Sequence, residues 1–190
     1  MARDFLTIVS GLPRSGTSMM MRMLDLGGIP ALTDNLRPAD EDNPLGYYEF
    51  EPVKRTRQDP SWLEGSEGKA VKMVHLLLLD LPTDRPYRVV FMRRHLREVV
   101  ASQNVMLRRK GRASDGLSED KLIAMFEDQI RQVESHLAAH ANFRLLEINY
   151  NDALRDPMEA ALKLDAFLGG GLDIRAMVGV VDPSLYRQRH

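Results

Sequence analysis

Residues that could do chemistry are concentrated in one loop near the start of this 190-residue chain. Positions 11–18 read Gly-Leu-Pro-Arg-Ser-Gly-Thr-Ser, which brings together two glycines, one cation and three hydroxyl side chains. An apolar run over 5–9 precedes the loop, and residues 17–26 carry apolar side chains at helical spacing. A loop between a strand and a helix directs unpaired backbone N–H groups and the positive end of a helix dipole to one point. Such a point binds phosphate or sulfate, so the loop is a candidate oxyanion site.

The same loop matches the Walker A phosphate-binding pattern of ATPases at three positions and departs from it at one. Gly11, Gly16 and Ser18 agree with the pattern, but Thr17 stands where an ATPase has its lysine. The cation of the loop comes earlier, at Arg14. The pattern therefore predicts a phosphate-binding loop that lacks the residue most diagnostic of Mg-ATP chemistry.

A second pair of candidate anion ligands follows the apolar run at 87–92. Arg93 and Arg94 come directly after this run, and Ser102 lies two helical turns beyond Arg94 in an expected helix over 96–109. In open α/β sheets, ligands bind at the carboxyl ends of the strands. Guanidinium groups form charge-assisted hydrogen bonds with phosphate oxygens. The spacing predicts a second anion contact at the same edge of the sheet as the loop.

The composition excludes several classes of protein and site. Hydrophobic residues make up 44% of the chain, which is enough for a core, and the length suits one domain spanning 1–190. The net charge of −1 argues against a nucleic-acid-binding protein. There is no cysteine for a disulfide or a thiolate site, and we expect no metal site. No apolar stretch has the ~18–20 residues of a membrane span, and the start lacks signal-peptide architecture, so we expect a cytoplasmic location and no membrane partner.

Apolar runs alternate with helical periodicities along the chain. Expected strands cover 5–9, 69–74, 87–92 and 143–148, and expected helices cover 17–26, 96–109, 118–139 and 155–168, followed by a short helix and a basic tail within 172–190. Ser118 and Asp152 are the expected N-caps, and Gly169 is the expected C-cap. Strands that alternate with long helices predict a parallel central sheet with helices on its faces. The expected fold is a three-layer α/β/α domain of the P-loop NTPase-like kind.

Three segments of the chain resemble, in the same order, motifs of the PAPS-dependent sulfotransferases, whose donor is 3′-phosphoadenosine 5′-phosphosulfate (PAPS). Pro-Arg-Ser-Gly-Thr-Ser at 13–18 resembles the loop that binds the 5′-phosphosulfate. Arg94 and Ser102 resemble the pair that holds the 3′ phosphate. The segment over 149–157, with Phe-Leu-Gly at 167–169, resembles a late structural part of that fold. The ordered set extends over most of the chain and is similar to a small bacterial-type sulfotransferase.

The resemblance implies an enzyme that moves a sulfuryl group from PAPS to a hydroxyl or amine of a small-molecule or glycan acceptor and releases PAP, without a metal. By matched position, the donor-binding residues would be Pro13, Arg14, Ser15 (through its amide), Gly16, Thr17, Ser18, Arg94 and Ser102. Arg14 and Lys72 would be the catalytic cations that stabilise the transferring group. The identity of the acceptor and the oligomeric state stay open, a homo-oligomer included.

The residue that takes the acceptor's proton is expected among three candidates, in the order Asp34, Glu49, His75. Asp34 lies beyond the first helix, in the region where some sulfotransferase branches carry a carboxylate base. Glu49 follows two tyrosines, which could form an acceptor pocket and raise its pKa. His75 follows Lys72 by three residues, one more than in the family's Lys-x-His motif, and residues three apart on a strand face opposite sides.

Two other functions stay open at this point. A P-loop nucleotide or small-molecule kinase would use the loop for ATP, but Thr17 replaces the lysine and Asp80, within a leucine run, is the nearest candidate for a metal-binding aspartate. A non-catalytic PAP- or nucleotide-binding protein would keep the phosphate-binding loop without a base. Donor turnover in the presence of an acceptor would separate these alternatives.

Overall fold

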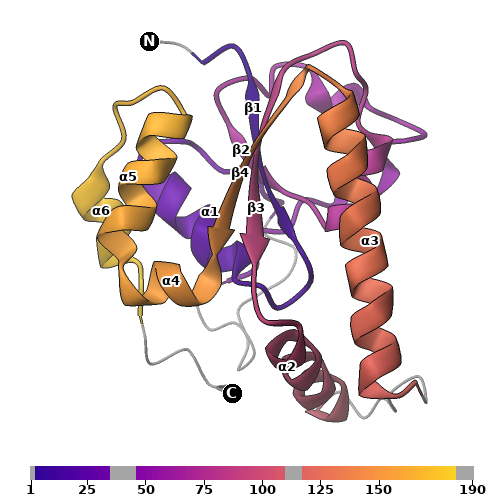
Figure 1. Ribbon diagram of the computed structural model, residues 1–190. Helices are drawn as coiled ribbons and strands as arrows, with labels where there is room; N and C mark the ends of the chain where they lie inside the picture. Colours follow the sequence, from indigo (N-terminus) through magenta and orange to yellow (C-terminus); the bar gives the residue numbers. More distant parts are fainter. Residues whose placement is uncertain (1–2, 35–45, 110–116, 183–190) are drawn as a thin grey trace.

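The computed structural model describes residues 3–34, 46–109 and 117–182 (Figure 1). Strands β1 (Leu6–Gly11), β2 (Ala70–Lys72), β3 (Tyr87–Arg93) and β4 (Phe143–Asn149) form a parallel sheet in the order β2-β1-β3-β4. The predicted parallel sheet is confirmed. Because Gly11 at the end of β1 pairs with Met92 near the end of β3, the loops that follow these two strands begin side by side.

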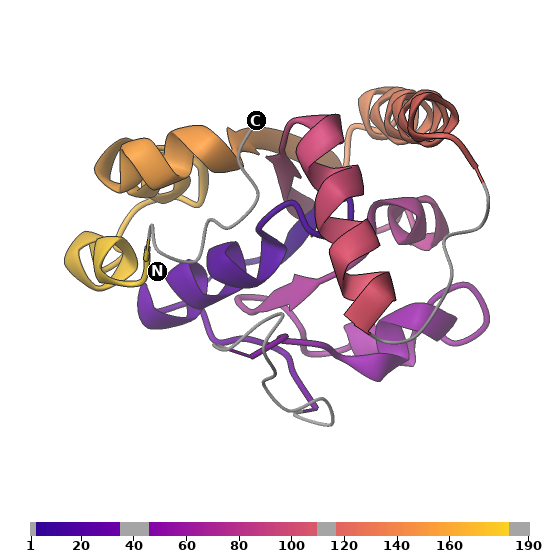
Figure 2. The ribbon, with the colours of Figure 1, turned by 90° about the horizontal axis from the view of Figure 1, so that it is seen from below.

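Helices cover both faces of the sheet, which confirms the predicted three-layer α/β/α architecture. One layer contains α1 (Thr17–Leu26), α4 (Tyr150–Arg155), α5 (Pro157–Phe167) and α6 (Ile174–Gly179). The other contains α3 (Glu119–Ala139) and the 3-10 helices η1 (Glu51–Arg55), η2 (Ser61–Leu63) and η3 (His75–Asp80). Helix α2 (Leu96–Arg109) lies across the carboxyl ends of the strands, and Figure 2 shows this edge from below.

Each face of the sheet packs on its own apolar core. Val9 and Val90 pack with residues of α1, α5 and α6, whereas Ile8 and Val89 pack with residues of α3 and η3. Since β1 and β3 are covered on both sides, they appear in the sequence as continuous apolar runs rather than as alternating patterns. Three methionines of α1 are fully buried, so this methionine-rich helix serves to fill the core beneath the sheet.

The chain after β4 folds into two helices where the sequence predicts one over 155–168. The side chain of Asn149 accepts hydrogen bonds from the N–H groups of residues 151 and 152 (2.9 and 3.2 Å) and so begins α4. Asp156 caps α5 by accepting from an N–H group three residues later (2.9 Å), and Pro157 occupies the first helical position. Proline has no N–H to continue the preceding helix, so the segment divides at this point. The prediction that Asp152 is the N-cap is wrong, because Asn149 caps the earlier turn.

The other boundaries lie close to those predicted. Ser118 caps α3 by accepting from the N–H of Lys121 (3.4 Å), and Gly169, with a φ of +90°, follows the C-cap of α5. The strand expected over 69–74 is shorter, because the chain leaves the sheet after Lys72 and enters η3. The end of the predicted basic tail, from 183 onward, lies outside the described residues. Within the described part of the chain, no helix has the length and apolarity needed to cross a membrane.

Candidate functional site

The loop between β1 and α1 turns sharply at three residues with positive φ: Gly11 (+145°), Arg14 (+72°) and Gly16 (+91°). A Cβ atom on Gly11 would lie 2.7 Å from the carbonyl oxygen of Met92, and one on Gly16 would overlap the ring of Tyr150. Glycine is therefore required at both positions, because the loop packs directly against the ends of β3 and β4. Because Arg14 is not a glycine, this left-handed backbone conformation costs ~1–3 kcal/mol, so the contacts around Arg14 must hold it there.

The helical end of the loop has the features of an oxyanion site. Within the described residues, no side chain caps the N-terminus of α1. Thr17 and Ser18 lie partly exposed in its first turn, and Pro13 is exposed in the loop before it. Backbone N–H groups at a helix N-terminus, together with the helix dipole, favour a bound anion. The first turn of α1 can therefore accept a phosphate or sulfate.

The hydroxyl and the amide of Ser15 are both bonded within the loop. Its side chain is buried, and its hydroxyl donates to the carbonyl of Leu12 (2.7 Å). Its backbone N–H donates to the same carbonyl (3.2 Å). The amide of Ser15 closes the turn of the loop, so the prediction that it binds the donor requires this hydrogen bond to be exchanged.

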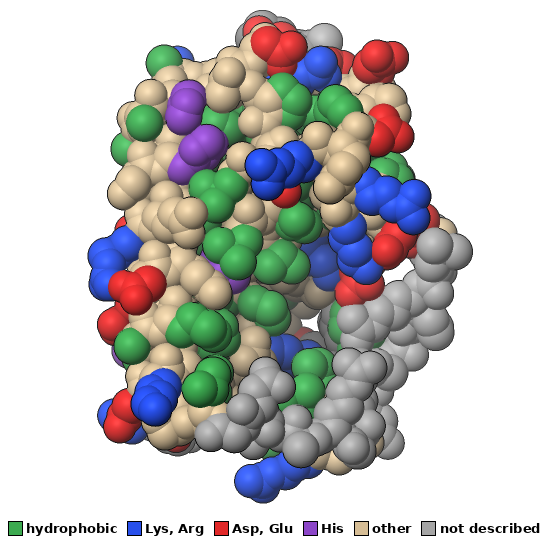
Figure 3. Space-filling model, turned by 90° about the vertical axis from the view of Figure 1, so that its right-hand side faces the viewer, with side chains coloured by type: hydrophobic (Ala, Val, Ile, Leu, Met, Phe, Trp, Pro, Cys, Tyr) green, Lys and Arg blue, Asp and Glu red, His purple; other side chains and the backbone are tan. Residues whose placement is uncertain are grey.

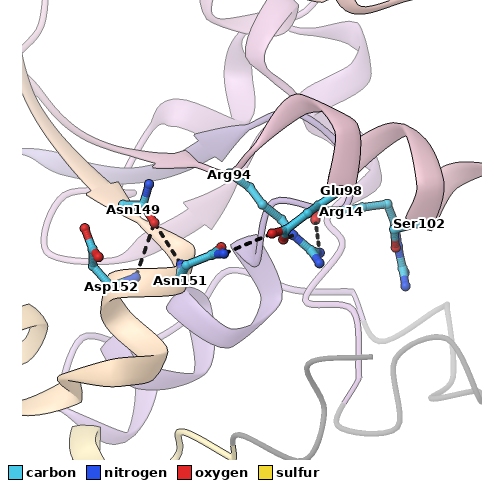
Figure 4. A network of polar contacts seen from close by, with 7 residues as sticks. All are labelled: Arg14, Arg94, Glu98, Ser102, Asn149, Asn151 and Asp152. Atoms are coloured by element: carbon cyan, nitrogen blue, oxygen red, sulfur yellow. Dashed lines mark hydrogen bonds and ion pairs between the residues drawn. The ribbon is translucent and has the colours of Figure 1, made fainter. Parts of the chain in front are cut away.

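The two anion-binding segments predicted from sequence meet in one polar network (Figure 4). Arg94 donates from Nη1 to the backbone carbonyl of Arg14 (2.9 Å) and from Nε to the Glu98 carboxylate (2.8 Å). Its guanidinium also lies over the ring of Tyr150, 4.8 Å from the ring centroid. Arg14 in turn donates from Nε to the Ser102 hydroxyl (3.0 Å). The loop after β1 and the start of α2 therefore form a single site, although they are far apart in sequence.

A further cation reaches the loop from the end of β2. The ammonium of Lys72 lies 3.5 Å from the Ser18 hydroxyl, donates a hydrogen bond to the carbonyl of Tyr47, and lies 5.8 Å from the centroid of the Tyr47 ring. The Ser18 hydroxyl donates to the same carbonyl (3.4 Å). Lys72 is thus placed beside the start of α1, and its role beside a transferring group stays a prediction.

The two carboxylate candidates for the base lie on adjacent segments. The Asp34 N–H donates to the carbonyl of Glu49 (3.1 Å), and the Asp34 carboxylate accepts from the N–H of Glu51 (2.6 Å) at the start of η1. Glu49 is partly exposed and lies two residues after Tyr47, whose carbonyl contacts Lys72. The segment of Glu49 therefore reaches the loop directly, whereas the carboxylate of Asp34 is bonded to the backbone of η1.

The third candidate base, His75, is packed inside the protein. It is the first residue of η3 and is 3% exposed, and its Nε2 lies 2.9 Å from Oε1 of Gln129 on α3. Burial lowers the pKa of His75, and its hydrogen bond with Gln129 acts in the opposite direction. This placement argues against His75 as the base, because its side chain is 3% exposed and its Nε2 is bonded to Gln129.

Comparisons with known proteins extend this picture. Neither protein-family models nor curated proteins match the chain. Among solved structures, it is similar to sulfotransferase STF1 from Mycobacterium tuberculosis (18% identity, 93% of this chain and 71% of that chain covered, TM-score 0.58). It is also similar to a sulfotransferase from Alicyclobacillus acidocaldarius (21% identity, 91% and 83% covered, TM-score 0.51) and to mouse sulfotransferase SULT7A1 complexed with PAP (16% identity, 95% and 63% covered, TM-score 0.53). The chain has the sulfotransferase fold.

Two further residues of the site, Tyr150 and Glu98, could be predicted from their positions in the sequence, although no motif contains them in a binding role. Tyr150 follows β4 directly, so it lies at the same edge of the sheet as Arg94. Glu98 lies four residues after Arg94, which is the spacing of a helical ion pair. The contact of Tyr47 with Lys72 has no such signal, because it is made by a backbone carbonyl.

The structure also separates the two neighbouring arginines after β3. Arg93 donates to Glu147 (2.8 Å from Nε) and to Glu134, and its guanidinium packs over Phe91 (4.9 Å). It lines a pocket of about 310 Å³ whose other lining residues are Leu12, Ser15, Met92, Arg94, Leu96, Val99, Glu127, Ile130, Arg131 and Glu134. Figure 3 shows the side of the molecule that carries α3, where Lys and Arg are interspersed with Asp and Glu. Arg93 is shared between two carboxylates, whereas Arg94 pairs with one carboxylate and also bonds the loop through the carbonyl of Arg14, so Arg94 is the better candidate for a phosphate ligand.

Replacing Gly16 with alanine should destabilise the protein and disrupt the loop. The added Cβ would combine a left-handed backbone, which costs ~1–2 kcal/mol, with an overlap on Tyr150 that costs a further ~1–3 kcal/mol. Gly170→Ala is the matched control, because Gly170 also has a positive φ (+82°) but a Cβ added there would meet no atom within 4 Å. Urea unfolding should give a clearly larger loss for Gly16→Ala, and equal losses would contradict the role of Tyr150.

Acidification should destabilise the protein through its packed histidines. Burial lowers the pKa of His75, and burial followed by the charge of His140 lowers the pKa of His136. Histidines in an unfolded chain titrate near about pH 6.5. Below that pH the unfolded chain binds more protons than the folded protein, so the free energy of unfolding falls as the pH falls toward the lowered pKa values.

Urea unfolding between about pH 7.5 and about pH 5.5 tests this dependence. His75→Gln should show a shallower dependence of the unfolding free energy on pH than the unmodified protein. His95→Gln, at an exposed position, is the matched control and should keep the original dependence. Parallel curves for the unmodified protein and His75→Gln would show that His75 does not contribute.

Proposed function

We propose that this protein is a sulfotransferase that takes a sulfuryl group from PAPS, transfers it to a hydroxyl or amine of a small-molecule or glycan acceptor, and releases PAP. The observation that carries the proposal is the hydrogen bond between the Arg94 guanidinium and the backbone carbonyl of Arg14 (2.9 Å). It joins the loop after β1 to the Arg94–Ser102 pair. A donor with phosphate groups at both its 3′ and 5′ positions requires two anion sites in such proximity.

The fold supports the same donor class. Structures with this fold include mouse SULT7A1 complexed with PAP and retinol dehydratase in complex with androsterone and PAP. In this protein, the N-terminus of α1 with Gly16, Thr17 and Ser18 would bind the 5′ side of the donor, and Pro13 would restrict the loop before it. Arg94 and Ser102 would bind the 3′ phosphate.

Arg14 and Lys72 would stabilise the group in transfer. As the bond from sulfur to the 5′-phosphate oxygen breaks, a bond from sulfur to the acceptor oxygen or nitrogen forms, and the acceptor's proton passes to a base. Negative charge then accumulates on the departing PAP, where nearby cations lower the barrier. The Lys72 ammonium lies 3.5 Å from the Ser18 hydroxyl in the first turn of α1, and Arg14 lies in the loop that leads into this turn, which suits this role.

The proposed base is Glu49, with Asp34 as its alternative. Tyr47 brings the segment of Glu49 into contact with Lys72, and this supports Glu49. The carboxylate of Asp34 accepts a hydrogen bond from the backbone of η1, which lowers its value as a proton acceptor. His75 stays the third candidate, because its ring is buried against Gln129.

Calorimetric titration with PAP, ADP and ATP, each with and without Mg²⁺, tests the donor class. We expect PAP to bind more tightly than ADP or ATP and to bind independently of Mg²⁺, because the proposed site would hold two phosphate groups and Thr17 stands in place of the Walker lysine. Preference for Mg-ATP would contradict the proposal and favour a kinase. Detectable PAPS turnover with an acceptor would then separate an enzyme from a protein that only binds the nucleotide.

Arg94→Ala should weaken PAP more than adenosine 5′-monophosphate (AMP), which lacks the 3′ phosphate. The loss of a charged hydrogen bond, ~1.5–3 kcal/mol, corresponds to about a tenfold to a hundredfold increase in the Kd for PAP. The Kd for AMP should change by less than about threefold, through the loss of support to the loop alone. Arg97→Ala, at an exposed position on α2, is the control. An equal weakening of both nucleotides would contradict the assignment of Arg94 to the 3′ phosphate.

A further inference from the structure

The ion pair between Arg94 and Glu98 is unusually deeply buried. The two side chains are 7% and 1% exposed, and Nε lies 2.8 Å from Oε2. Every other ion pair recorded within the described residues leaves more than a quarter of each side chain exposed. Removing two charges from water costs about as much as their attraction returns, so such a pair adds little net stability. Its main consequence is therefore geometric: it fixes the orientation of the guanidinium.

The Glu98 carboxylate is itself held from a second element. Its Oε1 accepts a hydrogen bond from the side-chain amide of Asn151 (3.1 Å), which belongs to α4. The backbone N–H of Asn151 is bonded to the side chain of Asn149 at the end of β4 (2.9 Å). Figure 4 shows Glu98 between Asn151 on one side and Arg94 on the other. The carboxylate is thus held by Arg94, between β3 and α2, and by Asn151 on α4, which comes from a distant part of the chain.

Arg94 is fixed in three directions as a result. Glu98 holds Nε, the carbonyl of Arg14 accepts from Nη1, and the ring of Tyr150 lies against the guanidinium face. An arginine side chain has ~2 kcal/mol of rotamer entropy, and here much of it is lost on folding. A ligand that binds to an ordered guanidinium avoids that cost on binding.

We propose that Glu98 is a positioning residue of the donor site, which together with Asn151 holds Arg94 in the orientation that binds the 3′ phosphate. This assignment rests on the proposed function, since it takes the 3′ phosphate of PAP as the ligand of Arg94. Glu98 acts through Arg94 and does not touch the donor.

The negative charge of Glu98 makes the proposal testable, because simple electrostatics and positioning predict opposite changes in the affinity for PAP. A carboxylate beside Arg94 reduces the attraction between Arg94 and a phosphate, so simple Coulomb attraction predicts that Glu98→Gln binds PAP more tightly. Positioning predicts the reverse. Glutamine has the shape of glutamate, but only one of its terminal atoms accepts a hydrogen bond, so it cannot accept at both positions where Glu98 meets Arg94 (Oε2) and Asn151 (Oε1).

Calorimetric titration of the purified full chain with PAP and with AMP provides the measurement. Glu98→Gln should raise the Kd for PAP about tenfold and the Kd for AMP less than about threefold, so that the preference for the 3′ phosphate falls. Glu119→Gln is the matched control, because it removes an exposed carboxylate that is 3.6 Å from Arg97, and it should leave both constants unchanged. Tighter binding of PAP by Glu98→Gln, or an equal loss for PAP and AMP, would overturn the positioning role.

A second variant keeps the test decisive if Glu98→Gln does not fold, which thermal unfolding would show. Asn151→Ala removes the hydrogen bond to Oε1 and leaves the ion pair in place, so it should lower the preference for PAP over AMP in the same direction and by less. Asp152→Asn is its control, since the neighbouring Asp152 pairs with Arg155 at the surface. An unchanged preference in Asn151→Ala would overturn the part assigned to Asn151.

The same titrations distinguish a failure of the proposed donor from a failure of the positioning role of Glu98. If the unmodified protein binds PAP no better than AMP, the proposed donor is wrong and the role of Glu98 falls with it. If the unmodified protein prefers PAP and Glu98→Gln keeps that preference, the donor stands and only the positioning role is overturned.

Discussion

The left-handed backbone of Arg14 is the constraint on which the rest of the site depends. With a φ of +72°, this residue turns the loop so that its carbonyl meets Arg94 and its side chain meets Ser102. The conformation is costly for a residue with a side chain, and the hydrogen bond from Arg94 offsets part of that cost. Two residues later, Gly16 packs so closely on Tyr150 that no side chain can be accommodated. The loop is therefore held from β3 and from β4 at the same time, and neither contact alone would define its shape.

The order of the strands makes these contacts available. In the strand order β2-β1-β3-β4, the central pair β1 and β3 lies between β2 and β4, and all four strands run in parallel. Residues that follow β1, β3 and β4 consequently meet at one edge, although they come from distant parts of the chain. Helix α2 then lies across that edge and brings Glu98 and Ser102, four residues apart on its buried face, to the same side as the loop.

The sequence contains enough information to predict the layers, the parallel sheet and the segments that form the site, because strand–loop–helix patterns and residue spacing are local properties. Residue roles that depend on contacts between distant segments are harder to predict. Asp152 is a reasonable cap on local grounds, but Asn149 caps α4 and Asp156 caps α5, because Pro157 divides the segment into two helices. Ser15 has the right residue type for a phosphate loop, yet its amide is bonded to Leu12. His75 has a functional residue type as well, and only the packing of α3 shows that its ring is buried.

Each cation of the proposed donor site is already bonded to an oxygen of the protein, and the kinds of oxygen differ. Lys72 donates to the neutral carbonyl of Tyr47, and Arg14 donates to the neutral hydroxyl of Ser102; a charged oxygen of the donor forms a stronger hydrogen bond than either of these oxygens. Arg94 is bonded to the buried carboxylate of Glu98, and separating these two charges would leave Glu98 unpaired at a cost of several kcal/mol. Donor binding should therefore leave the Arg94–Glu98 pair intact. The end of the site that would recognise the 3′ phosphate is then fixed by a buried ion pair before the donor arrives.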